Sequence, residues 1–150
     1  MLRLTTVLFL MIMAAACVND ELCTGEGTNE IKLRFIESGS DPEAPISITF
    51  DSIGVSGEPP AYPSYADTTL SVLELEVDPD STTTRFIFIT ADRTDTLDLG
   101  YRVTPSFISV QCGPELLFSE LDTLKHTFDS LVIVQTLFDK EVDSNIKIYY

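Results

Sequence analysis

The three cysteines are the residues of this sequence whose chemistry is easiest to assign. Cys17 follows Ala14-Ala15-Ala16, and these come after a basic start and an apolar run from Leu4 to Met13. Such a layout is typical of a secretory signal, and the apolar run is shorter than the roughly 20 residues that span a bilayer. A Cys directly after small residues resembles a bacterial lipobox, although Ala14 stands where Leu is usual. The pattern predicts cleavage before Cys17 and diacylation of its sulfur.

The two other cysteines are expected to pair with each other. An odd number of cysteines in an exported protein leaves one over. If Cys17 carries lipid, Cys23 and Cys112 remain, and an oxidising compartment favours a disulfide between them. A bridge of that span is worth on the order of 4 kcal/mol at most in the chain-entropy description. The alternatives are an ordinary cleaved signal, with Cys17 as a plain thiol or disulfide partner, and two free buried thiols.

Other side chains give weaker signals for chemistry. His126 is the only histidine, and its polar surroundings indicate a surface or loop residue rather than a catalytic base. Oxygen ligands of the kind that calcium prefers gather at 78–81 and at Asp92, Asp95 and Asp98. Neither group forms a twelve-residue calcium loop, so turn residues are the plainer interpretation. The sequence therefore predicts no catalytic residue, no metal site and no cofactor.

Charge and length limit the class of protein. The 150 residues include 9 Lys or Arg and 24 Asp or Glu, which gives a net charge of −15. Phosphates repel so acidic a chain, so nucleic acid is not an expected partner. The length suits one domain. We divide the chain into a signal peptide at 1–16, a lipid-anchored tether at 17–29 and a folded domain at 30–150.

The segments that must position these residues have the pattern of short β-strands. Apolar and polar residues alternate in most of them, as in a half-buried strand, while 84–91 is apolar on both faces and suits a central strand. Three prolines exclude a central strand or helix from the loop at 54–69, which is a connector or a tyrosine-bearing contact site. The expected strands are 30–37, 46–53, 70–77, 84–91, 96–103, 107–112 and 145–150.

One segment, 114–131, allows two interpretations. Its Leu and Phe residues recur at spacings of 4, 3, 4 and 3, which fits one face of a helix. The other interpretation is a strand to Leu121, a loop that holds His126 and a strand from Ser130 to Phe138. With seven to nine short strands in total, the sequence predicts an antiparallel, immunoglobulin-like β-sandwich, with a small β-barrel as the alternative.

Several motifs together resemble a known family. These are Asp20-Glu21-Leu22-Cys23 soon after Cys17, the run Ile108-Ser109-Val110-Gln111-Cys112-Gly113, Phe118 and the ending Ile146-Lys147-Ile148-Tyr149-Tyr150. The chain is similar to a family of small Bacteroidetes lipoproteins with a domain of unknown function, number 6452. The resemblance implies a lipoprotein attached to the outer membrane and a strand-loop-strand structure for 115–138. Family members often have Thr-Pro where Thr28-Asn29 stands here, and the proline-rich loop has no counterpart. The resemblance implies no activity.

These observations predict a non-enzymatic binding or assembly module in the cell envelope. Cys17 would attach it to the outer membrane, facing the periplasm or the cell surface, and an envelope protein or a glycan would be its partner. A calcium-dependent carbohydrate or protein binder is the alternative function. An envelope hydrolase that uses carboxylates is less favoured, because acidic residues are too numerous for a catalytic pair to be assigned.

Overall fold

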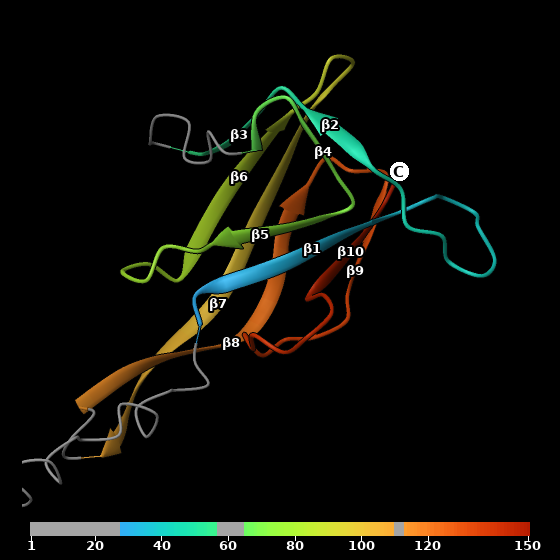
Figure 1. Ribbon diagram of the computed structural model, residues 1–150. Coiled ribbons are helices and arrows are strands. Elements are labelled where there is room, and N and C mark those ends of the chain that lie inside the picture. The colour runs from blue at the N-terminus through green and yellow to red at the C-terminus, as the bar shows by residue number, and fades with distance from the viewer. Residues whose placement is uncertain (1–27, 57–64, 110–112) are drawn as a thin grey trace, which may run out of the picture.

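The computed structural model describes residues 28–56, 65–109 and 113–150, and these residues form ten β-strands and no α-helix (Figure 1). Most strands alternate buried apolar with exposed polar side chains, which is the period of a half-buried strand. The strands are β1 (Glu30–Ile36), β2 (Ile48–Phe50), β3 (Ser52–Val55), β4 (Thr68–Leu70), β5 (Val72–Glu76), β6 (Thr83–Ile89), β7 (Thr94–Ser109), β8 (Gly113–His126), β9 (Ser130–Ile133) and β10 (Ile146–Tyr149).

Two four-stranded sheets face each other across the core. One has the order β5-β1-β10-β9 and the other the order β3-β6-β7-β8, while β2 and β4 form a separate pair. All strand pairs are antiparallel except β1 with β10, where Leu33 stands beside Ile146 in a parallel register. None of the sheets formed by the described residues closes into a barrel. The predicted β-sandwich is confirmed, and the alternative small β-barrel is not adopted.

Two of the expected strands are each divided into two, and the expected strands 96–103 and 107–112 are joined in β7, so ten strands form rather than seven to nine. The segment expected at 46–53 breaks at Asp51, and the segment expected at 70–77 breaks at Ser71. The two short strands before the breaks, β2 and β4, pair with each other. The two strands after the breaks join the large sheets, β3 beside β6 and β5 beside β1. The Asp51 amide donates to the Ile89 carbonyl at 2.8 Å, so the break itself is tied to the sheet.

The ambiguous segment is a strand. The structure places β8 from Gly113 to His126 and β9 from Ser130 to Ile133, so the helical interpretation is wrong and the strand-loop-strand interpretation is confirmed. The first strand is longer than expected and includes His126, and the second ends before the expected Phe138. A β-bulge around Glu120 is the physical reason for the misleading pattern. The extra residues at a bulge shift the alternation, and Phe118 and Leu121 are both buried although they are three residues apart.

Strand β7 is also longer than expected and passes through Pro105. Its pairing with β6 ends at Gly100, and the Tyr101 amide still donates to the Thr82 carbonyl at 3.0 Å. Beyond that point β8 is the only strand paired with β7 among the described residues. A strand with a free edge tolerates a residue that lacks a backbone N–H.

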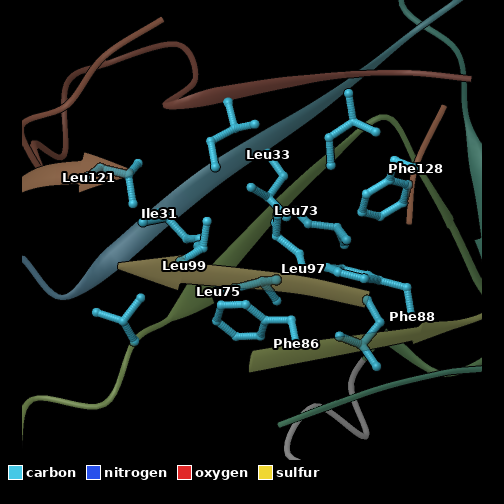
Figure 2. Close-up of a cluster of buried hydrophobic side chains, with 14 of the residues drawn as sticks. Ile31, Leu33, Leu73, Leu75, Phe86, Phe88, Leu97, Leu99, Leu121 and Phe128 are labelled. Carbon is cyan, nitrogen blue, oxygen red and sulfur yellow. The ribbon is translucent and has the colours of Figure 1, made fainter. Parts of the chain in front are cut away.

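The core is built from the inward faces of both sheets (Figure 2). Phenylalanines link the layers, because the Phe50 ring of β2 contacts both Phe35 of β1 and Phe88 of β6, at centroid distances of 5.4 Å and 6.1 Å. Such contacts add to the stabilisation from burial alone. A second aromatic group joins Tyr101, Phe118 and Phe138 under β8. The fully buried side chains include Ile31, Leu33, Phe35, Phe50, Ile53, Leu73, Leu75, Phe86, Phe88, Leu97, Leu99, Ile146 and Ile148.

Candidate functional site

An open groove of about 530 Å³ lies at the end of the sandwich where the described part of the chain begins. Four separate segments contribute to it: the start of β1, the turn after β5, the first half of β8 and the loop before β10. Its lining mixes apolar with polar and charged side chains, a combination that is common in ligand-binding sites. The lining residues are Thr28, Asn29, Glu30, Pro79, Leu116, Phe118 and Lys140.

Hydrogen bonds fix the wall of the groove formed by the start of β1. The Val77 amide donates to the Asn29 carbonyl at 2.8 Å, and the Asn29 side chain donates back to the Val77 carbonyl at 3.2 Å. Thr28 is buried, and its hydroxyl accepts from the Glu30 amide at 3.1 Å. Thr28 and Asn29 are therefore held in place although they precede the first strand.

The opposite wall belongs to a projecting pair of strands, residues 102–109 of β7 and 113–119 of β8, which we call the arm. In Figure 1 the two strands extend past the ends of β1 and β5 at the lower left. The arm begins directly beyond the β-bulge, where Glu120 adopts φ of 54°. Because a bulge bends and twists a strand pair, it directs the arm away from the body of the sandwich.

One face of the arm is apolar and continues the core outward. Within the arm, Pro105 stands opposite Leu116 and Phe107 opposite Pro114. Alternation in both strands places these four side chains on the same face as buried Phe118. The exposed fraction rises along this face, from 4% at Phe118 to 41% at Leu116 and 67% at Phe107. We call Pro105, Phe107, Pro114 and Leu116 the apolar face of the arm.

At the other end of the sandwich a buried carboxylate joins the two sheets. Asp95, at the start of β7, is 2% exposed and accepts from Arg93 at 2.8 Å, from the Thr127 hydroxyl at 2.9 Å and from the Tyr150 hydroxyl at 3.0 Å. The Arg93 guanidinium also lies over the Tyr150 ring, 5.1 Å from its centroid. This cluster fastens Tyr150 to the opposite sheet, so its role is structural.

The contacts around Asp95 determine the ionisation states of Tyr150 and Arg93. Withdrawal from water and the hydrogen bond to Asp95 raise the pKa of the Tyr150 hydroxyl far above its usual range. The hydrogen bond from Arg93 to Asp95 likewise raises the pKa of Arg93. Near neutral pH, Tyr150 is therefore a neutral hydrogen-bond donor and Arg93 a fixed cation.

His126 is the last residue of β8 and is half-buried. Its Nδ1 lies 3.1 Å from the Phe128 carbonyl oxygen, a contact within the turn that leads to β9. The sequence predicts a surface or loop residue here, and the structure places His126 at the boundary between strand and turn.

The aspartates considered as calcium ligands serve in turns and ion pairs. Asp78 accepts the Asp80 amide at 2.9 Å, an Asx turn of the kind expected from the sequence. Asp98 forms a two-pronged pair with Arg85, with both distances 2.6 Å, and this contact lowers the pKa of Asp98. Among residues 28–56, 65–109 and 113–150, no group of three or more His, Cys, Asp or Glu side chains is arranged to hold a metal ion.

The predicted lipidation residue Cys17 and the predicted disulfide residues Cys23 and Cys112 lie outside the described residues, so these assignments stay predictions.

The groove could not be predicted from the sequence, because its wall residues come from segments that are distant in the chain. The apolar face of the arm did leave a signal. Pro105 and Phe107 extend the alternation of Leu97, Leu99, Tyr101 and Val103. If one strand had been predicted through Pro105, this alternation would have placed Pro105 and Phe107 on the apolar face.

Comparison with known proteins assigns the chain to a family. Residues 52–150 match a family of unknown function, DUF6452. The chain belongs to the DUF6452 family. The match covers β3 to β10 and so includes the arm, the bulge and the buried Asp95 cluster. No curated protein and no solved structure matches the chain. Within the described part of this DUF6452 protein, no helix is both long and apolar enough to cross a membrane.

Proposed function

We propose that this DUF6452 protein is a lipid-anchored module of the cell envelope that binds a partner in the groove between the start of β1 and the arm. The observation that carries the proposal is the position of the groove. Thr28, which lines it, is the first described residue and belongs to the tether expected at 17–29. A partner bound there would be held next to the outer membrane to which Cys17 is expected to be attached.

The hydrogen bonds that Asp95 and His126 form within the fold agree with a non-enzymatic role. Asp95, the most deeply buried carboxylate among the described residues, accepts hydrogen bonds from three side chains of the fold. His126 is engaged within its own turn. The groove itself presents one carboxylate, Glu30, and one amine, Lys140, beside amide, hydroxyl and apolar groups. This chemistry suits recognition of a partner.

The proposed disulfide would fasten the tether to the arm. Cys23 comes five residues before Thr28, and Cys112 comes directly before Gly113, where β8 begins. Thr28 and Leu116 line the same groove, so the two cysteines flank segments that lie at one end of the molecule. A non-reducing peptide map is expected to contain Cys23 and Cys112 in one linked peptide, and free thiols at both positions would contradict the pairing.

Metabolic labelling tests the anchor. Cells that express the full chain are fed an alkyne fatty acid, and the protein is purified and coupled to a fluorophore. We expect label on the wild-type protein and none on Cys17→Ser, with Cys23→Ser as the matched control that keeps its label. Equal labelling of wild type and Cys17→Ser would disprove anchoring through this residue.

Photo-crosslinking tests the groove in living cells. A benzoylphenylalanine at position 140 lies in the groove, whereas one at exposed position 92 lies at the opposite end of the sandwich. We expect a discrete adduct from position 140 that is absent from position 92. The adduct should be lost when Glu30→Lys reverses the charge of the carboxylate that lines the groove. If position 140 gives no adduct, or both positions give the same ones, the groove is not the binding site.

A further inference from the structure

We propose that the apolar face of the arm inserts into the interfacial region of the membrane that carries the lipid anchor, so that the arm is a second, non-covalent contact with the bilayer. This inference rests on the proposed anchoring of the chain. It adds a surface, defined by Pro105, Phe107, Pro114 and Leu116, that sets how the domain stands on the membrane.

The arm presents an apolar face that no part of the described chain covers. Phe107 is 67% exposed and Leu116 is 41% exposed, and each stands opposite an exposed proline. None of the four side chains is charged, although the chain as a whole has a net charge of −15. Single exposed apolar residues are ordinary, but a continuous group of them on a projecting element marks an interaction surface.

The apolar face lies on the same side of the molecule as the predicted anchor. Leu116 and Thr28 line one groove, and Thr28 comes eleven residues after Cys17. A fully extended chain of that length spans less than about 40 Å. The arm is thus at the end of the sandwich that the tether holds nearest to the lipid.

The size of the surface favours a membrane over a second copy of the chain. Stable protein interfaces use about 20–30 residues on each partner, and the apolar face has four. A weak contact is sufficient at a membrane, because the anchor already keeps the arm at a high effective concentration beside the lipid. Proline and phenylalanine also bring no charge that would have to be desolvated on insertion.

Tryptophan fluorescence provides a direct test, since the chain contains no tryptophan. Residues 17–150, with Cys17→Ser and a hexahistidine tag in place of the signal segment, are held on phosphatidylcholine vesicles by a nickel-chelating lipid. The probe is Phe107→Trp, and the matched control is Ile89→Trp, 38% exposed at the opposite end of the sandwich. With brominated lipid we expect at least about a twofold loss of emission and a blue shift for Phe107→Trp, and little change for Ile89→Trp.

The outcomes separate this inference from the proposed anchor, because the nickel lipid holds the protein whether or not cells acylate Cys17. Emission from Phe107→Trp that brominated lipid does not quench would overturn the insertion. A blue shift that is already complete without vesicles would also overturn it, since the tether or a second copy would then cover the arm. Quenching of Phe107→Trp would uphold the insertion even if metabolic labelling showed no lipid on Cys17.

Discussion

The carboxylate of Asp95 joins three parts of the chain that are far apart in sequence: the start of β7, the turn after β8 and the C-terminal residue Tyr150. A buried charge is stabilising only when it is paired and hydrogen-bonded. Here one cation and two hydroxyl groups meet that requirement. The network explains how the last residue of the chain is held against the opposite sheet, and it leads to two predictions about Tyr150.

The first prediction is that Tyr150→Phe lowers the free energy of unfolding by about 1–2 kcal/mol, because the buried Asp95 carboxylate loses one donor while the aromatic ring remains. Urea denaturation followed by circular dichroism measures the change. Tyr149→Phe is the matched control. Its hydroxyl donates to Glu43 at the surface, and we expect no measurable change in the urea midpoint. Equal effects at the two positions would contradict a special role for Asp95.

The second prediction concerns alkaline pH. The pKa of Tyr150 is raised above its ordinary value near 10 by loss of hydration and by the hydrogen bond to Asp95. The folded state thus holds this proton more tightly than the unfolded chain. Its contribution to stability is complete below about pH 10 and is lost as the pH rises from there toward the folded pKa. The urea midpoint should fall more between about pH 9 and pH 11 in wild type than in Tyr150→Phe. Parallel pH profiles would refute the assignment.

At the scale of elements, period-2 alternation is a dependable guide wherever a strand is regular. It locates β1 and β10 within one or two residues, because each has one buried face, and the apolar run at 84–91 locates β6 equally well. Alternation fails where the backbone departs from regular geometry. The breaks at Asp51 and Ser71 and the bulge at Glu120 depend on which partner strand is available, and a local pattern does not contain that information.

The bulge supports a third prediction. Glu120 adopts φ of 54°, a left-handed conformation that disfavours residues with a side chain. We expect Glu120→Gly to raise the free energy of unfolding by up to about 1 kcal/mol, despite the loss of an exposed ion pair with Arg102. Glu120→Val should lower stability, and Glu120→Gln, which removes only the charge, should leave it unchanged. Urea denaturation of the three variants checks the order, and a destabilised Glu120→Gly would show that the backbone is not strained there.

At the scale of the whole molecule, the candidate site arises from topology. The groove brings together the start of β1, the turn at Pro79, β8 and the loop at Lys140, and no local sequence signal connects these segments. The parallel pairing of β1 with β10 matters here, because it carries the chain end toward the Asp95 cluster, while the start of β1 and the arm lie at the opposite end. A fold class can be predicted from composition and pattern, but a surface assembled from four segments requires the structure.

Net charge supports the last prediction, which belongs to the molecule as a whole. With a net charge of −15 on 150 residues, the excess carboxylates repel one another in the folded state and destabilise it. Raising NaCl from about 0.01 M to about 1 M shortens the Debye length from about 30 Å to about 3 Å and screens this repulsion. The exposed pairs Arg85–Asp98 and Arg102–Glu120 lose little, because surface ion pairs contribute little, and the Asp95 cluster is shielded by burial.

Calorimetry should therefore show Tm rising by about 3–8 °C over this range of salt, as expected for a gain on the order of 1 kcal/mol in a small domain. The control is the same titration near the isoelectric point of about 4.1, where net repulsion vanishes and Tm should hardly respond. A Tm that falls with salt at neutral pH would mean that attractive pairs outweigh the repulsion. The surface charge would then be arranged in stabilising networks, and the excess of carboxylates would not be the dominant electrostatic feature of the fold.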